Sequence, residues 1–249
     1  MIWDEEIETE LAGLGEISRY AAGTWLPDTV NKQPVIRHIL SGHVDIHAIK
    51  LSHPILIARY GPGEILGIRS NIYPVNQPQS RCRAFSDIEC REISWQAVET
   101  LSSSNSRLES MMQHIAQVRT YGAAIAIHPG FSCLNLDERR SLFDHSIVRL
   151  LAPGEKLICK SELRAHMYLL ISGSVDIISD GISIAKRSKG EILGEISLLG
   201  FSKAPTADVI AESFSEIIEF RDTDILAAIQ ENPVFKQRIT ALIDSRTLA

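Results

Sequence analysis

Apolar and polar residues alternate in short runs along much of the chain, and glycines separate one run from the next. In the C-terminal half, Val175–Ile178 is enriched in β-branched residues, Asp180-Gly181 supplies a tight turn, and Ser183–Lys186 continues as a second strand. Four glycines of this half stand 8 to 19 residues apart, at Gly154, Gly173, Gly181 and Gly190. Short strands with glycine turns at this spacing predict a sandwich or barrel of β-strands.

Apolar residues recur at helical spacing beside these strand-like regions. Ser94–Tyr121 places Leu108, Met111, Ile115 and Val118 on one face, three or four residues apart. Further helices are predicted over Asn135–His145, Thr223–Gln230 and Pro233–Asp244. The chain is therefore expected to be mainly β with flanking α-helices.

Residues 39–67 and residues 170–194 contain the same two motifs, S-G-x-V-D-I followed by G-E-I-L-G. Gly42 corresponds to Gly173, an offset of 131, and Gly63 corresponds to Gly190, an offset of 127. The difference falls around Lys50–Pro54, where a hairpin loop can change length without disturbing its strands. The repeat predicts two domains, residues 1–121 with an acidic extension at residues 1–16, and residues 122–249, joined near residues 122–130.

The composition fits this organisation and argues against several classes of protein. The 249 residues are enough for two domains of ordinary size. The formal net charge of −6 argues against a protein that coats nucleic acid, because phosphate binding relies on lysine and arginine. No apolar run approaches the roughly 18 residues that cross a bilayer, so membrane insertion is not expected. The acidic N-terminus lacks the pattern of a signal peptide, which predicts a cytoplasmic protein.

The sequence lacks the common catalytic motifs. It has no P-loop, no nucleophile elbow and no acidic pair in a setting for general acid and base chemistry, so no enzymatic activity is expected. Residues 61–67 have the spacing G-x-G-x-x-x-G, which differs from that of a dinucleotide loop. The histidines at His38, His43, His47 and His53 are interpreted as surface residues and the four cysteines as free thiols. No metal and no cofactor are predicted.

Three motifs of the second copy resemble one known family. A-P-G-E stands at Ala152–Glu155, I-S-G-S-V at Ile171–Val175 and G-E-I-L-G-E-I-S-L-L at Gly190–Leu199. These residues resemble the cyclic-nucleotide-binding domain family of protein kinase A regulatory subunits, gated channels and catabolite-activator-type regulators. The likeness covers Leu134 to Ile243, and residues 17–121 resemble the family more weakly. It implies two tandem β-rolls, of the double-stranded β-helix or jelly-roll-like type, with helical connections.

The resemblance also implies a ligand site in the second copy. In this family a turn leads into a short helix whose backbone N–H groups face the cyclic phosphate, and a glutamate accepts a hydrogen bond from the ribose 2′-hydroxyl. The implied ligand-binding residues are Gly194, Glu195, Ile196, Ser197, Leu198, Lys203, Thr206 and Ala207. Lys203 is either a point charge for the phosphate or a solvated loop lysine.

Both copies depart from the family's pattern where the anion should bind. In the second copy, Pro205 stands where the family has arginine, and Asp208 stands where it has serine or threonine. Loss of a charged hydrogen bond costs roughly 1.5–3 kcal/mol, and an aspartate beside the phosphate would repel it as well. In the first copy, Ile68 replaces the glutamate and Pro78 stands at the arginine position.

The first copy instead carries three arginines in its ligand-binding segment. Arg69, Arg81 and Arg83 form either an anion site or part of a solvated strand face, since Arg81 and Arg83 alternate and share one face of a strand.

Two functions follow from these features. The first is a non-enzymatic sensor, in which a cyclic nucleotide or a related phosphorylated small molecule binds the second β-roll and changes the affinity for a partner protein. The second is a scaffold that binds partners without ligand, both pockets being degenerate. Leu108, Met111, Ile115 and Val118 form an apolar stripe on residues 106–121. This stripe predicts either a homodimer seam, as in regulators of this family, or packing against its own β-roll or the second domain. Six residues follow Ile243, so no DNA-reading domain is expected.

Overall fold

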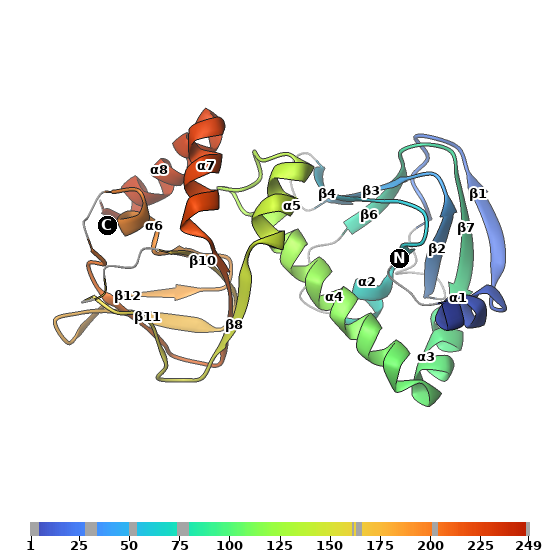
Figure 1. The fold of residues 1–249 in the computed structure, drawn as a ribbon, viewed down its shortest axis with the longest axis horizontal. Coiled ribbons are helices and arrows are strands. Elements are labelled where there is room, and N and C mark those ends of the chain that lie inside the picture. Colours follow the sequence, from blue (N-terminus) through green and yellow to red (C-terminus); the bar gives the residue numbers. More distant parts are fainter. Residues whose placement is uncertain are drawn as a thin grey trace. The chain divides into compact units, whose positions relative to one another are not determined.

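The computed structural model describes residues 5–27, 34–49, 54–73, 80–160, 162, 166–200 and 204–247. The chain divides into two compact units, Met1–Ala123 and Ala124–Ala249, each with its own antiparallel sheets (Figure 1). None of the described helices is both long and apolar enough to cross a bilayer.

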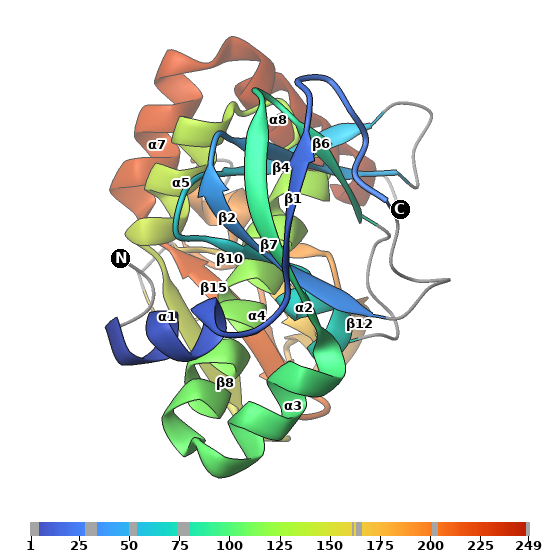
Figure 2. The same ribbon diagram turned by 90° about the vertical axis from the view of Figure 1, so that its right-hand side faces the viewer.

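The first unit contains a four-stranded and a three-stranded sheet. Its elements are α1 (Glu5–Ala12), β1 (Glu16–Tyr20), β2 (Val35–Ser41), β3 (Val44–Ala48), β4 (Ile55–Tyr60), β5 (Ile65–Leu66), α2 (Ile68–Ile72), β6 (Ser80–Ala84), β7 (Ile88–Ser94), α3 (Trp95–Ser104) and α4 (Ser106–Ile127). The sheets have the strand orders β1-β7-β2-β5 and β4-β3-β6, and Figure 2 shows β1, β7 and β2 side by side. Both sheets contribute to one apolar core, which includes Ile39, Val44 and Leu66.

A second apolar cluster joins the helices of this unit to its sheet. Leu108 is fully buried there against strand residues such as Ile36 and Ile93, and Met111 and Ile115 pack at its edge. These residues of the predicted stripe therefore pack against their own β-roll, one of the two alternatives that the sequence left open.

The helical pattern predicted over residues 94–121 is divided between two helices, α3 and α4. Ser94 caps α3 by accepting a hydrogen bond from the Ala97 N–H, and α3 ends at Ser104. The Asn105 side chain then accepts from the Leu108 N–H at 3.0 Å and starts α4. An asparagine that caps a helix in this way competes with continued helix, which explains the break. The predicted link at residues 122–130 is helical as far as Ile127.

The second unit repeats this arrangement with two four-stranded sheets. Its elements are α5 (Leu136–Asp144), β8 (Ile147–Leu151), β9 (Lys156–Ile158), β10 (Met167–Ser172), β11 (Ser174–Ser179), β12 (Ile182–Ser188), β13 (Ile192–Leu193), α6 (Glu195–Leu198), β14 (Asp208–Ala211), β15 (Ser215–Phe220), α7 (Asp222–Glu231) and α8 (Pro233–Thr247). The strand orders are β13-β10-β15-β8 and β12-β11-β14-β9. Asp180 and Gly181 have φ values of 52° and 82°, which confirms the tight turn between β11 and β12.

The strand orders of the two units correspond element by element. β1-β7-β2-β5 matches β8-β15-β10-β13, and β4-β3-β6 matches β12-β11-β14. The counterpart of β9 in the first unit is a bridge between Trp25 and Arg83. The prediction of a mainly β protein with two β-rolls and flanking helices is therefore confirmed.

A left-handed glycine precedes the short helix of each roll. Gly67 before α2 has a φ of 90°, and Gly194 before α6 has a φ of 79°. A Cβ at Gly194 would overlap the carbonyl oxygen of His166, and one at Gly67 would lie 2.8 Å from the carbonyl oxygen of Val35. Only glycine fits both the conformation and the close approach, so this turn fixes where each short helix begins.

Candidate functional site

A cavity of about 350 Å³ opens in the second unit beside α6. Its walls come from β9 to β13, from α6 and from residues 205–209. Pockets of about 300–1,000 Å³ accommodate small organic ligands, so the size suits a nucleotide. Ile158, Ile177, Ile184 and Val209 give the cavity an apolar wall, which suits a flat aromatic ring.

Glu195 brings a carboxylate to this cavity. It is the first residue of α6, lines the cavity, and is 4% exposed. β13 pairs with β10, with Tyr168 opposite Leu193, and the turn at Gly194 then directs the chain into α6. A buried carboxylate is costly unless it accepts hydrogen bonds, so this position favours a ligand or neighbour that donates them.

Most of the predicted ligand-binding residues do meet at this cavity. The lining includes Gly194, Glu195, Ile196, Ser197, Thr206 and Ala207. Lys203 lies outside the described residues. The structure thus brings together two segments that stand about ten residues apart in the sequence.

Leu198 is the one described residue of the predicted set that does not line the cavity. Its N–H donates to the Gly194 carbonyl at 3.3 Å, because α6 is one turn long and Leu198 completes that turn. Its side chain is buried and does not belong to the cavity lining. The amide groups that remain for a ligand are those nearer to the start of the helix.

The two departures from the family's pattern behave differently. Pro205 lines the cavity, so the position where the family has arginine does face the ligand space. Asp208 instead stands between Ala207 and Val209, which line the cavity, and its side chain belongs to the opposite face of the strand. Its carboxylate lies 2.7 Å from Lys156 Nζ and accepts the Lys160 N–H at 2.7 Å.

This pairing changes the pKa of both partners in the direction that keeps them charged. The hydrogen bond from the Lys156 ammonium lowers the pKa of Asp208, and the same bond raises the pKa of Lys156. Asp208 is therefore a charged partner of Lys156 outside the cavity. The register of β14 turns this side chain away from the cavity, where the sequence had placed it beside the expected phosphate.

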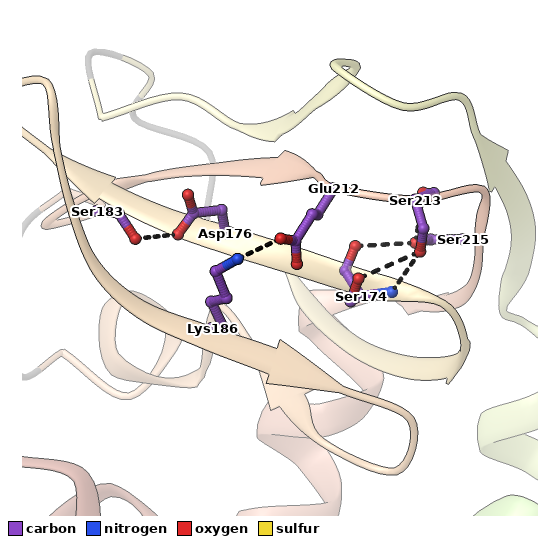
Figure 3. Close-up of polar contacts among 7 residues, drawn as sticks. All are labelled: Ser174, Asp176, Ser183, Lys186, Glu212, Ser213 and Ser215. Carbon is purple, nitrogen blue, oxygen red and sulfur yellow. Dashed lines mark hydrogen bonds and ion pairs between the residues drawn. The ribbon is translucent and has the colours of Figure 1, made fainter.

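Arg187 is a cavity residue that the sequence did not point out. On β12, Ala185 and Arg187 line the cavity, whereas Lys186 pairs with Glu212 on the opposite face, where Ser183 donates to Asp176 (Figure 3). Arg187 Nη1 donates to the Lys186 carbonyl at 3.0 Å, and Nε lies 3.4 Å from Glu191 Oε1. Strand alternation places Ala185 and Arg187 on one face, but which face is inward needed the structure.

Two rings complete the wall near α6. His166 and Tyr168 line the cavity with their ring centroids 6.2 Å apart. Burial raises the pKa of Tyr168 to about 12, so its hydroxyl stays protonated and can donate a hydrogen bond.

The corresponding region of the first unit differs in the residue that begins the short helix and in the size of its cavity. Ile68 stands where the second unit has Glu195 and is fully buried in the apolar cluster. Arg69 and Arg81 line a smaller cavity of about 100 Å³. Arg83 does not line it, because its Nε donates to the Gly23 carbonyl at 3.0 Å. Pro78 lies outside the described residues. Among the described residues of the chain, no group of His, Cys, Asp and Glu side chains has the arrangement of a metal site.

Comparisons with known proteins address the second unit most directly. Residues 148–232 match the family model described as "Cyclic nucleotide-binding domain". Potassium channel KAT3 of Oryza sativa subsp. japonica is 36% identical over 85 residues, which are 32% of this chain and 17% of the channel. The voltage-gated inwardly rectifying potassium channel KCNH6 of Homo sapiens is 27% identical over 86 residues, 34% of this chain and 9% of the channel. The chain thus spans less than a fifth of either curated relative.

Solved structures with a similar trace include regulatory and sensor proteins. The regulatory domain of Toxoplasma gondii PKA with cAMP is 16% identical, with a TM-score of 0.46, covering 99% of this chain and 91% of that one. The catabolite activator protein of Thermus thermophilus is 26% identical, with a TM-score of 0.42, covering 48% of this chain and 58% of that one. Residues 148–232, which match the model of the cyclic nucleotide-binding domain, include all the described residues that line the cavity of the second unit.

Proposed function

We propose that the second unit binds a cyclic nucleotide, or a related phosphorylated small molecule, and that the protein is a non-enzymatic regulator. The observation that carries this proposal is Glu195, a carboxylate 4% exposed on the wall of a cavity of about 350 Å³. It stands within the residues that match the cyclic nucleotide-binding family.

Each part of the ligand has a matching part of the cavity. Glu195 accepts a hydrogen bond from the ribose hydroxyl, and the amides of Ile196 and Ser197 with the Thr206 hydroxyl face the phosphate. The purine lies along the apolar wall. Arg187 is the one arginine among the described lining residues, which include no lysine, and it supplies the positive charge that Pro205 lacks.

The output of binding is a change in the protein's surface. The ligand shifts the protein between two states only by its difference in affinity for them. α6 contacts both β10 and α8, so a movement of α6 on ligand binding is passed directly to the C-terminal helix. A partner protein that contacts α8 then binds one state better than the other.

Calorimetric titration of the full chain with cyclic AMP and cyclic GMP tests the proposal. Glu195→Gln keeps the shape and removes the charge, and we expect it to weaken binding by about tenfold or more, since a hydrogen bond to a charged group contributes roughly 1.5–3 kcal/mol. Glu212→Gln is the matched control, because Glu212 pairs with Lys186 on the opposite face of the sheet. Equal affinities of Glu195→Gln and the wild type would overturn the proposed site.

A ligand-independent scaffold is the second candidate function, and Pro205 favours it. This proline occupies the cavity wall where the family has its phosphate-binding arginine. If the wild-type protein gives no heat with either cyclic nucleotide and no thermal shift with cyclic dinucleotides, the scaffold replaces the sensor. A ligand at 100 times its dissociation constant should stabilise the protein by about 2.7 kcal/mol, so a true ligand is visible in that assay.

A further inference from the structure

Strand β8 lies at the edge of a sheet in the second unit and exposes apolar side chains. It pairs with β15 on one side, and among the described residues no strand pairs with its other side. Ile147 is 56% exposed, Val148 37% and Leu150 75%. The outer N–H and C=O groups of an edge strand can pair with a further strand, and native proteins usually block such edges with charged side chains. β8 therefore has the surface that an added strand requires.

The edge strand in the corresponding position of the first unit is charged. β1 exposes Glu16 and Arg19, and Arg19 Nε lies 2.7 Å from Glu89 Oε2 on the neighbouring strand β7. Arg19 stands directly opposite Glu89 in the register of the two strands. Ile17, at 42%, is the one exposed large apolar residue of β1. The ion pair keeps this edge hydrated and unsuited to a further strand.

Leu150 takes the place of Arg19 in the second unit. Glu89 and Glu216 each stand opposite the serine of the repeated S-G motif, so they occupy corresponding positions. Leu150 stands opposite Glu216, as Arg19 stands opposite Glu89. The second unit thus keeps the glutamate but has an apolar side chain where the first unit has an arginine.

Phe214 extends the exposed apolar surface at the end of β8. It is 78% exposed and directly precedes β15. Ser215 pairs with Leu151, so Phe214 and the exposed Ala152 continue from this pair at the end of the two strands. Exposed apolar side chains that are contiguous mark a surface for interaction with another protein.

We propose that β8 pairs antiparallel with β8 of a second copy of this chain, about a two-fold axis through Leu150. An axis perpendicular to the joined sheet keeps every side chain on its own face. It places Leu150 opposite Leu150 of the partner subunit. Val148 stands opposite Ala152 of the partner subunit, whose small side chain leaves room for it. Arg149 stands opposite Leu151 of the partner subunit, so every row of the pair contains apolar surface.

The neighbouring registers are less favourable. An axis through Arg149 would set two arginines directly opposite each other, which destabilises a strand pair. An axis through Val148 would place Ile147 opposite Arg149 of the partner subunit and Leu150 opposite Ser146 of the partner subunit. The axis through Leu150 sets no charged side chain opposite another and covers the most exposed residue of β8.

The charges near β8 allow two copies to approach along this edge. Arg149 Nη1 lies 3.1 Å from Glu219 Oε2, so its charge is balanced within its own sheet. The two copies of Glu216 would lie three strand spacings apart, roughly 14 Å, which exceeds the screening length of about 8 Å. Pairing joins two four-stranded sheets and uses both free edges of β8, so assembly stops at the dimer.

Sedimentation equilibrium of the full chain, from low to high micromolar concentration, tests the proposal. Each copy contributes one short strand, so we expect the wild type to show a weak monomer–dimer equilibrium in this range. Leu150→Arg restores the arginine and glutamate pair seen in the first unit, and thermal melting checks that the variant folds. We expect it to raise the dissociation constant of the dimer by about hundredfold or more, because the two-fold axis removes two buried leucines at once.

Ile182→Arg is the matched control and should leave the association unchanged. Ile182 is 69% exposed and lies on β12, an edge strand of the other sheet of the second unit. The association is expected with or without a cyclic nucleotide, so this proposal does not depend on ligand binding by the second unit.

Mild oxidation of variants with one added cysteine tests the register. Leu150→Cys sets its two copies opposite each other and should give a disulfide-linked dimer. Val148→Cys should not, because its two copies stand four residues out of register. The wild type provides the background from the native free cysteines. A monomeric wild type, wild-type association in Leu150→Arg, loss of association in Ile182→Arg, or faster cross-linking of Val148→Cys than of Leu150→Cys would each overturn the proposal.

Discussion

The glycine turn before the short helix is followed by an acidic residue in the second unit and by an apolar residue in the first. After β13, Gly194 leads to Glu195, which is buried but faces a cavity of about 350 Å³. After β5, Gly67 leads to Ile68, which is fully buried in an apolar cluster, and the nearby cavity of about 100 Å³ is lined by arginines. The strand orders correspond, so the difference arises from a few side chains rather than from the backbone.

This comparison shows how one β-roll can present different side chains to its cavity. The second cavity has a carboxylate and an apolar wall, whereas the first cavity is lined by arginines. Exchange of an acid for an isoleucine also changes what the short helix does. In the second unit it presents a polar group to the cavity, and in the first it adds to the core.

Gly194→Val is expected to have the largest effect on stability, because it disrupts a turn that occurs in both units. The φ of 79° is strained for any other residue, at about 1–3 kcal/mol, and a Cβ would also overlap the His166 carbonyl. We expect the second unit to lose about 3 kcal/mol or more in its free energy of unfolding, measured by urea denaturation followed by circular dichroism.

Substitutions at two other glycines distinguish the cost of a strained φ from the cost of overlap between the new Cβ and a neighbouring atom. Gly190 has a φ of 89° but no atom within 4 Å of an added Cβ, so Gly190→Val should show the cost of strain alone. Gly67→Val should fall between the two, since its nearest backbone atom is 2.8 Å away. Equal losses at Gly190 and Gly194 would contradict the close approach at α6.

Glu92→Gln tests the polar contacts that hold the sheet of the first unit. Glu92 accepts hydrogen bonds from Tyr20 at 2.7 Å and from Arg37 at 2.5 Å, which tie β7 to β1 and β2. Burial raises the pKa of Glu92, but these hydrogen bonds outweigh it and the net pKa is lowered. We expect the variant to lose about 1–3 kcal/mol of stability at neutral pH.

The lowered pKa also fixes the direction of the pH dependence. The stabilisation by Glu92 is complete above its unfolded pKa of about 4.3 and disappears as the pH falls through the lower folded value. Wild-type protein should therefore lose stability in that window, and Glu92→Gln should lose less. Glu89→Gln is the control on the same strand, because the pair of Glu89 with Arg19 is exposed. A Glu92→Gln protein with the wild-type acid profile would count against this assignment.

Local sequence patterns predicted the fold and most of the second cavity because they encode local geometry. Asp180-Gly181 specifies a hairpin turn, and the repeated G-E-I-L-G motif specifies a strand and a left-handed turn before a short helix. Glu195 follows that turn directly, so its place in the cavity is a local consequence of the motif. Ser197 and Ile196 follow for the same reason.

The remaining site residues depend on contacts that no local pattern carries. Arg119 reaches the cavity of the first unit from α4, 50 residues beyond Arg69, and its place depends on how that helix packs. The orientation of Asp208 depends on the register of β14, since a shift by one residue would turn it into the cavity. Leu198 lies outside the cavity lining, and the sequence did not show that α6 ends after one turn.

Pro205→Arg gives the second cavity the kind of charge that the first cavity has. Pro205 is buried on the cavity wall, and an arginine there can reach a bound phosphate with two parallel N–H groups. We expect the affinity for cyclic AMP to rise by about tenfold, measured by calorimetry. Pro205→Gln is the uncharged control, and an equal gain in both variants would show that the proline ring, rather than the missing charge, limits binding.

Asp208→Asn is expected to have the smallest effect, and it tests which face of β14 meets the ligand. Asp208 is paired with Lys156 at 2.7 Å and lies outside the cavity lining, so the affinity for cyclic AMP should change by less than about twofold. If this carboxylate instead faced the phosphate, its neutralisation would strengthen binding by about tenfold or more. Lys156→Met is the matched control, because it removes the partner charge without altering the cavity wall. A marked gain in affinity for Asp208→Asn alone would place the aspartate in the ligand space and would make the contrast between the two cavities smaller.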